Sequence, residues 1–145
     1  MTVPSDPIPA DPRDLGMEPH PEGGWYRETW RSRQTIATPR GDRALATSVS
    51  FLLQPGEVSA WHRVASDELW IWSGGGPVRV TLGGDGPHPG DESGESVVLG
   101  PGGQFLVPAG QWQTAEPDDD RATLVACIVA PGFDFADFEL VEPSS

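Results

Sequence analysis

GEVSAWHRVASDELWIWSGG, residues 56–75, sets one histidine and one glutamate between two glycines. His62 follows Gly56 by six positions, and Glu68 comes six positions later, ahead of Gly75. Imidazole and carboxylate groups transfer protons near neutral pH and also bind transition metals. We therefore expect this stretch to carry both the pattern of the fold and the centre of a functional site.

A second glycine-rich segment lies further along the chain. Gly102, Pro108 and Gly110 precede Gln113 in this segment. Together the two segments resemble the paired sequence motifs of cupins, at the separation that cupins show. The resemblance implies an all-β fold, the cupin double-stranded β-helix, which is a conical jelly-roll barrel of the RmlC-like type. In such a barrel the pocket lies inside, lined by side chains from alternate strand positions.

Two positions depart from the cupin pattern. Val64 stands where the first motif usually has a second histidine, and Gln113 stands where the second motif has its histidine. The remaining set, His62, Glu68 and Gln113, would bind a divalent metal ion only weakly. Alternatively the site is metal-free, with His62 as general base or acid and Glu68 as its partner or as a substrate acceptor, or His62 is purely structural. The cofactor is thus open between a weakly bound divalent metal and none.

Composition independently favours an all-β domain. The 145 residues include 18 glycines and 16 prolines, which separate short apolar runs as in β sandwiches and barrels. We expect a flexible arm rich in proline and aspartate over residues 1–14, a single domain over 15–141 and a tail over 142–145. Predicted strands cover 25–31, 46–53, 67–72, 78–82, 97–99, 104–107, 112–114 and 123–130, and residues 132–140 form either a short helix or an edge segment.

The charge and the apolar runs exclude several kinds of partner. A net charge of −13, with nine arginines and no lysine, argues against nucleic acid, which is bound by clustered cations. Without lysine there is no Schiff-base chemistry. No apolar run is long enough to span a membrane, and the first residues lack an export signal, so we expect a cytoplasmic protein without a membrane partner. Cys127, in an apolar run, is expected to be buried and unreactive.

Strand periodicity predicts which residues accompany Glu68. Trp70 and Trp72 follow at alternate positions and share its face, so one wall of the pocket is expected to be aromatic. Each tryptophan either fills the core or stacks on a ligand. A small-molecule ligand with flat or apolar faces suits such a wall.

Further segments make the resemblance more specific. They are HPEGGWYRETWR (20–31), FLLQPGEVSAWHRVASDELW (51–70), LVPAGQWQTA (106–115) and APGFDFADFEL (130–140). Together they resemble the cupin-5 family, formerly called DUF985. The resemblance implies a homodimer whose N-terminal strands extend the partner's sheet, and it implies no settled activity. Members commonly have a histidine at the position of Ser73, so that side chain's chemistry is missing here.

A looser similarity links the chain to dTDP-4-dehydrorhamnose 3,5-epimerases. Their early G-x-F-x-E pattern is matched in spacing by Gly24, Tyr26 and Glu28. In that family the histidine at the position of His62 removes a proton next to a ketone. By this analogy Tyr26 is a candidate proton donor on the opposite face of the substrate.

Two arginines are candidates for binding the substrate. Arg27 and Arg63 would hold a carboxylate, a phosphate or a developing enolate. Either could instead be an exposed arginine paired with Glu28 or Asp67.

Three functional hypotheses follow. The first is an enzyme performing acid–base chemistry of the epimerase, isomerase or lyase type on a small oxygenated metabolite such as a keto-sugar or keto-acid. In it His62, Glu68 and Tyr26 are catalytic, and Arg27, Arg63, Trp70, Trp72 and Gln113 bind the substrate. The second is a non-catalytic dimer that binds a small molecule. The third is a weakly metal-dependent enzyme.

Overall fold

The computed structural model describes residues 11–90 and 94–141. Within them the strands are β1 (Glu18–Pro19), β2 (Trp25–Arg31), β3 (Thr35–Thr38), β4 (Gly41–Ala44), β5 (Thr47–Leu53), β6 (Ser59–Val64), β7 (Asp67–Gly75), β8 (Val78–Leu82), β9 (Ser96–Leu99), β10 (Gln104–Val107), β11 (Gln113–Pro117), β12 (Thr123–Ala130) and β13 (Phe138–Leu140). Two short 3₁₀ helices, η1 (Pro12–Leu15) and η2 (Phe135–Asp137), complete the chain.

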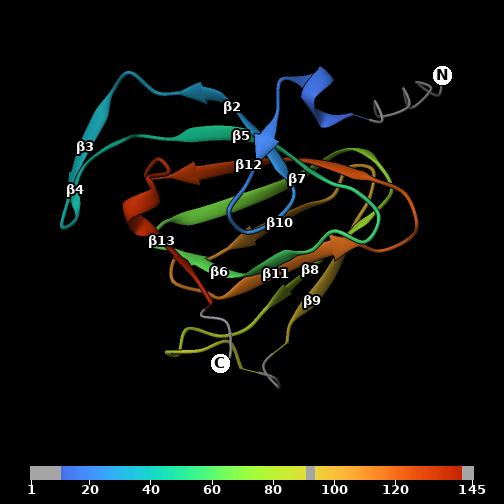
Figure 1. Cartoon of the computed structure of the whole chain (residues 1–145). Coiled ribbons are helices and arrows are strands. Elements are labelled where there is room, and N and C mark those ends of the chain that lie inside the picture. The colour runs from blue at the N-terminus through green and yellow to red at the C-terminus, as the bar shows by residue number, and fades with distance from the viewer. Residues whose placement is uncertain (1–10, 91–93, 142–145) are drawn as a thin grey trace.

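Two antiparallel sheets pack face to face, and a separate hairpin projects from one end (Figure 1). The larger sheet has the order β1-β2-β5-β12-β7-β10, and the smaller sheet has the order β13-β6-β11-β8-β9. Within the described ranges, strands β3 and β4 pair only with each other. The prediction of an all-β jelly-roll fold of the cupin type is confirmed.

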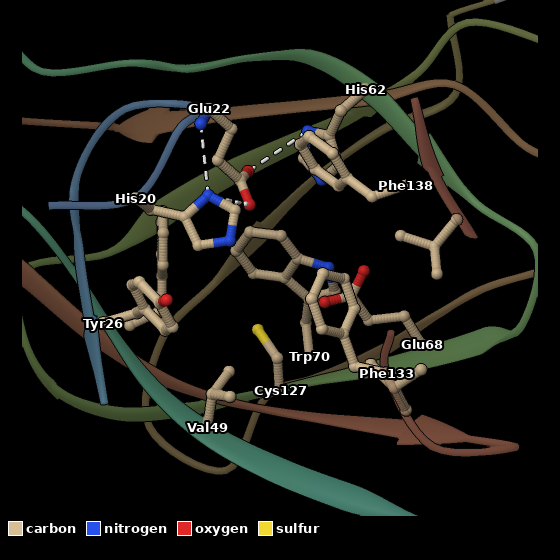
Figure 2. Close-up of a pocket in the computed structure, with 13 residues that line it drawn as sticks. His20, Glu22, Tyr26, Val49, His62, Glu68, Trp70, Cys127, Phe133 and Phe138 are labelled. Atoms are coloured by element: carbon tan, nitrogen blue, oxygen red, sulfur yellow. Dashed lines mark hydrogen bonds and ion pairs between the residues drawn. The ribbon is translucent and has the colours of Figure 1, made fainter. Parts of the chain in front are cut away.

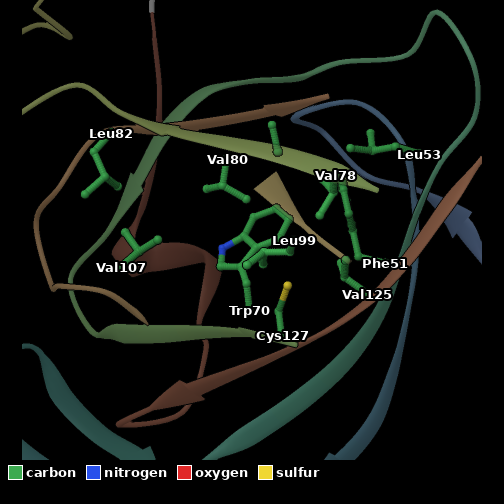
Figure 3. Packing of buried hydrophobic residues seen from close by; sticks show 11 residues of the cluster. Phe51, Leu53, Trp70, Val78, Val80, Leu82, Leu99, Val107, Val125 and Cys127 are labelled. Carbon is green, nitrogen blue, oxygen red and sulfur yellow. The ribbon is translucent and has the colours of Figure 1, made fainter. Parts of the chain in front are cut away.

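The core lies between the two sheets (Figure 3). Strand β12 shows why: its sequence TLVACIVA alternates buried and half-buried residues, so every second side chain enters the core. Its partners do the same, and Phe51, Trp70, Val80 and Val125 are each at most 3% exposed. Burial of this alternate face, rather than any single contact, stabilises the sandwich.

The register of β12 gathers the residues of the site. Cys127 is opposite Trp70 of β7 on one side and Val49 of β5 on the other. Two residues later, Val129 is opposite Glu68. Because residues opposite each other share a face of the sheet, these side chains enter the space between the sheets together.

Several elements differ from the sequence prediction. The segment 59–64 forms β6, although its mixed sequence SAWHRV gave no clear strand signal. Strands β3 and β4, which the sequence analysis did not predict, form a hairpin around Pro39 and Arg40. Residues 132–140 contain both predicted alternatives, since η2 is followed by the edge strand β13.

The predicted N-terminal boundary falls near the start of the described residues. Residues 1–10 and 142–145 lie outside the described residues, so the predicted arm is described only in part and the predicted tail not at all. Within the predicted arm, Asp11 caps η1 by accepting a hydrogen bond from Arg13, and Pro12 is buried. The described part of the arm thus contributes a single capped turn ahead of β1. Across the described ranges no helix is long and apolar enough to cross a membrane.

The C-terminal segment is attached to the β3–β4 hairpin by ion pairs. Asp137 of η2 accepts hydrogen bonds from Arg43 Nε at 2.8 Å and from Arg40 Nε at 3.0 Å. The Asp137 side chain is 1% exposed, and Arg43 holds its pKa below the ordinary value. A paired, nearly buried carboxylate of this kind fixes the segment that follows it.

Candidate active site

A cavity of about 40 Å³ lies between the sheets, closed on one side by the C-terminal segment (Figure 2). One water molecule needs roughly 10–15 Å³ of such cavity volume, so the cavity holds a group of only a few heavy atoms. Its walls are mainly apolar and aromatic, with two histidines and two glutamates among them. The lining residues are His20, Glu22, Tyr26, Val49, Phe51, His62, Val64, Glu68, Trp70, Cys127, Val129, Phe133 and Phe138.

A wider cleft of about 520 Å³ adjoins this cavity. The two spaces share Tyr26, Val49 and Phe133. We call them the inner cavity and the outer cleft. The arrangement suits a ligand with a small head in the inner cavity and a larger body in the outer cleft.

His62 projects from β6 and is 2% exposed. Its Nδ1 lies 2.7 Å from the carbonyl oxygen of Ala60 and 3.1 Å from Oε2 of Glu22. A carbonyl only accepts, so Nδ1 carries the proton. Burial lowers the pKa of His62, so the neutral ring dominates near pH 7. Its Nε2 then holds a lone pair, and no hydrogen-bond partner for it is found within residues 11–90 and 94–141.

Glu22 lies between His62 and His20 (Figure 2). Its Oε1 is 3.2 Å from Nδ1 of His20, and Oε2 accepts a hydrogen bond from Ser59. Its backbone carbonyl accepts a hydrogen bond from the amide of Ala60 at 2.7 Å, which ties the turn to the start of β6. Burial raises the pKa of Glu22 to about 8, so the carboxyl is mostly protonated at neutral pH.

His20 completes this group of titratable side chains. Its Nδ1 accepts a hydrogen bond from the backbone amide of Glu22 at 3.1 Å, so that nitrogen has no proton. Burial, and secondarily the nearby His62, lowers the pKa of His20 to about 4. Neutral His20 therefore carries its proton on Nε2. Its ring packs edge-on against Tyr26 at 4.7 Å and Phe138 at 5.6 Å.

A buried hydrogen-bond network holds the Glu68 side chain. Gln113 donates from Nε2 to Oε1 of Glu68 at 2.7 Å, and its own Oε1 accepts from the indole of Trp70 at 2.8 Å. Burial raises the pKa of Glu68, and Glu22 adds to the effect, while His62 opposes it. Glu68 is therefore a weak buried acid next to the cavity, and Gln113 sets its orientation.

Removing this support is expected to destabilise the fold. Replacing Gln113 with leucine leaves the Glu68 carboxyl and the Trp70 indole without their partner, and we expect a loss of about 3 kcal/mol in unfolding free energy. Urea unfolding measures the change. Gln111→Leu is the control, since Gln111 is only half-buried. Equal stability of Gln113→Leu and the wild type would show that the network contributes nothing.

The buried carboxyl of Glu22 predicts a pH-dependent stability. A raised pKa stabilises the fold below the ordinary value of 4.5, and that contribution is lost as pH rises through about 8. His20 has the opposite sign: its contribution is present above 6.5 and is lost as pH falls through about 4. Between pH 6.5 and 8, a change in unfolding free energy therefore reports on the buried carboxyl and not on His20.

Glu22→Gln is expected to flatten the stability profile in that range. The wild type should lose up to about 1.4 kcal/mol per pH unit on account of Glu22, and the variant should lose less. Urea unfolding at a series of pH values measures both slopes. Glu116→Gln is the control, because this exposed glutamate lies on β11 away from the cavity. Identical slopes in the wild type and Glu22→Gln would contradict the assignment.

Four of the residues predicted for the site line the inner cavity: His62, Glu68, Tyr26 and Trp70. Trp72 does not line it and instead packs against the core, with its indole donating to the carbonyl of Gly76 at 2.9 Å.

The two arginines predicted to bind substrate lie outside both spaces. Arg27 is exposed, and its side chain lies close to Gly16. Arg63 donates to Glu139 at 2.8 Å and lies 4.6 Å from the centre of the Trp112 ring. The alternative of an exposed ion pair therefore describes Arg63 better, although its partner is Glu139 rather than Asp67.

Sequence reasoning missed His20 and Glu22. Both lie in HPEGGW, a segment quoted for the family resemblance but not considered as a source of site residues. The available signal was a histidine and a glutamate two positions apart just before two glycines. Cys127, expected to be buried and unreactive, lines the cavity, and burial raises the pKa of its thiol well above the usual range. Ser73 is exposed on β7, so the position that usually has a histidine faces away from the cavity.

The donors do not fit the proposed metal site. Gln113 does not line the cavity, and its amide oxygen is occupied by the Trp70 indole. Nowhere in the described ranges do three His, Cys, Asp or Glu side chains form a group suited to an ion. A neutral amide engaged in this way is a poor ligand for a transition metal. We therefore derive no chemical step through a metal.

Comparisons with known proteins agree with the fold. Residues 13–141 match the family described as Cupin superfamily (DUF985). A hypothetical protein from Leishmania major is 31% identical, with a TM-score of 0.78 over 90% of this chain and 84% of that one. A Shewanella oneidensis protein is 36% identical, with a TM-score of 0.76 over 90% and 81%. An uncharacterized Saccharomyces cerevisiae protein is 26% identical over 90% of this chain and 77% of its own length.

More distant enzymes share the fold alone. Oxalate decarboxylase from Bacillus subtilis is 17% identical, with a TM-score of 0.63 over 88% of this chain and 30% of that one. The family match covers nearly the whole described chain and includes both sheets and the inner cavity. The chain therefore belongs to the DUF985 family of the cupin superfamily.

Proposed function

We propose that this protein is an enzyme that performs acid–base chemistry, of the isomerase, epimerase or lyase type, on a small oxygenated metabolite. The observation that carries the proposal is the Nε2 atom of His62, which has a lone pair and no hydrogen-bond partner among the described residues, at the wall of the inner cavity. Imidazole is the side chain best matched to proton abstraction at neutral pH. Low polarity around it strengthens any charge interaction formed during the reaction.

The chemical step is a proton transfer next to a carbonyl group. The C–H bond breaks, its electron pair moves to the carbonyl oxygen as an enolate, and the proton goes to Nε2 of His62. The imidazolium that forms is stabilised through Nδ1 by the Ala60 carbonyl and the Glu22 carboxyl. Returning the proton to another position or face completes an isomerisation, and loss of a neighbouring group completes a lyase reaction.

Two groups in the cavity can supply a proton during such a step. Burial raises the pKa values of both Glu22 and Glu68, so each carboxyl is protonated over a wider range than in water. Tyr26 is a third candidate proton donor, which lies at the boundary with the outer cleft. Burial and the nearby Glu18 raise the pKa of its hydroxyl. We propose Glu68 as the main proton donor, because Gln113 fixes its orientation.

Exchange of substrate hydrogens with solvent deuterium tests the proposal. Small ketones and hydroxyketones are incubated with the native protein in deuterated buffer, and the loss of the proton signal is followed by NMR. We expect at least one ketone to exchange faster than with free imidazole at equal concentration. Exchange no faster than with free imidazole for the whole series would remove the support for catalysis.

A non-catalytic binding protein is the second candidate. The observation in its favour is a set of hydrogen bonds that Glu68, Gln113 and Trp70 make with one another beside a largely apolar cavity. Such an arrangement suits a site that only encloses a ligand. Tight binding of a ketone without hydrogen exchange would favour this candidate over the enzyme.

We also propose a homodimer, as the family resemblance implies. In support, Trp30 of β2 is 53% exposed and Ile36 of β3 is 45% exposed, and among the described residues β1 pairs only with Trp25 and Tyr26 of β2. Exposed apolar side chains beside an open strand edge suit contact with a second copy. The cytoplasmic location stays a prediction.

A further inference from the structure

No arginine lines the inner cavity. All nine arginines lie in the described ranges, and there is no lysine in the chain. Only Arg31 reaches the outer cleft, where it donates to Glu28 at 2.6 Å and to the carbonyl of Phe133 at 3.2 Å. A bound anion would thus find no uncommitted cation of the kind that normally recognises carboxylates and phosphates.

Carboxyl groups line both spaces instead. Glu22 and Glu68 lie in the inner cavity, and Glu18, Glu28 and Asp134 lie in the outer cleft. Of the outer three, Glu28 is paired with Arg31, and Asp134 lies 3.9 Å from Arg43. An anion would meet like charge in the outer cleft, and in the inner cavity it would lose its hydration among mainly apolar walls that offer no cation.

The two histidines present complementary hydrogen-bonding atoms. His20 has its proton on Nε2, since its Nδ1 accepts from the Glu22 amide. His62 has a lone pair on Nε2, since its Nδ1 donates to Ala60. Neither Nε2 atom has a hydrogen-bond partner in the part of the chain that the structure describes. One donor and one acceptor match a carbonyl oxygen and an acidic hydrogen of the same molecule.

We infer that the site selects an uncharged carbonyl compound, with its carbonyl oxygen accepting from His20 and its adjacent C–H facing His62, and rejects carboxylates and phosphates. This inference rests on the proposed function and narrows its substrate class. Keto-acids and sugar phosphates are excluded, and compact ketones with an apolar body remain. The small volume of the inner cavity admits the carbonyl end only, while the body lies in the outer cleft.

A matched pair of ligands tests the selection. Both are methyl ketones with the same three-carbon chain, which ends in a tert-butyl group in one and in a carboxylate in the other. Binding to the native protein is measured by ligand-observed NMR. We expect the neutral ketone to bind at least about tenfold more tightly, equivalent to roughly 1.4 kcal/mol. Equal or tighter binding of the carboxylate, or binding of neither ligand at millimolar concentration, would overturn the inference.

Charge variants locate the origin of the preference. The double variant Glu18→Gln/Asp134→Asn removes two carboxylates of the outer cleft. It is expected to reduce the gap, which is the difference in affinity between the two ligands. Glu116→Gln/Asp120→Asn removes two exposed charges that line neither space and should leave the gap unchanged. Equal narrowing in both variants would trace the preference to net charge and contradict a selective site. Selective binding without hydrogen exchange would overturn the proposed catalysis alone.

Discussion

Replacing His62 with glutamine is expected to lower the rate of solvent deuterium exchange into a ketone by roughly 10²–10⁴-fold. Glutamine is polar and of similar length, but its amide has no basic lone pair. The cavity should persist, because glutamine can still donate to the Ala60 carbonyl that now holds Nδ1. The rate is followed by NMR with a ketone that exchanges with the wild type.

His88→Gln is the matched control for this experiment. His88 is exposed and lies outside the cavity, so its replacement should leave the rate unchanged. Near-ultraviolet circular dichroism shows whether the packing of the aromatic residues is retained. A folded His62→Gln protein that exchanges as fast as the wild type would show that another group is the base.

Replacing Gly24 with alanine is expected to reduce the unfolding free energy by about 4 kcal/mol. Gly24 has a φ of +75°, and a Cβ atom there would lie 2.8 Å from Phe51 Cζ and 2.9 Å from the carbonyl oxygen of Leu52. Real Cβ atoms essentially never approach so closely, and the Leu52 carbonyl belongs to β5 and cannot easily move. The turn that presents His20 and Glu22 would therefore shift as well.

Gly56→Ala separates the cost of an unfavourable backbone conformation from the cost of a steric clash. Gly56 has a similar φ of +84°, but nothing lies within 4 Å of the added Cβ. We expect a loss of about 1 kcal/mol there, from backbone conformation alone. Urea unfolding of both variants measures the difference. Equal losses would show that the crowding around Gly24 has no energetic effect.

Alternation along strands accounts for what could be predicted about the site. Glu68 and Trp70 lie two positions apart on β7, so both enter the cavity as expected. The same rule argues against Arg27 and Arg63. Each follows a cavity residue directly, Tyr26 or His62, and adjacent residues of a strand face opposite sides. Analogy with other enzymes suggested these arginines, and strand geometry was the better guide.

His20 and Glu22 could not be placed by periodicity. They belong to the turn before β2, where successive side chains follow no fixed alternation. Glu22 reaches His62 only because that turn packs against the start of β6, through its hydrogen bonds with Ser59 and Ala60. Contacts between a turn and a distant strand depend on the completed fold. The motifs therefore predicted the barrel and half of the site, and tertiary packing supplied the other half.

The ion pairs of Asp137 connect the site to the β3–β4 hairpin, which lies away from the cavity. Phe138 follows Asp137 directly, stacks on His62 at 5.6 Å and covers the cavity. Arg40 and Arg43 hold Asp137 from the β3–β4 hairpin, so the residue before Phe138 is fixed by contacts that lie outside the cavity. The hairpin thus contributes no atom to the cavity's walls, yet it holds the segment that carries Phe138.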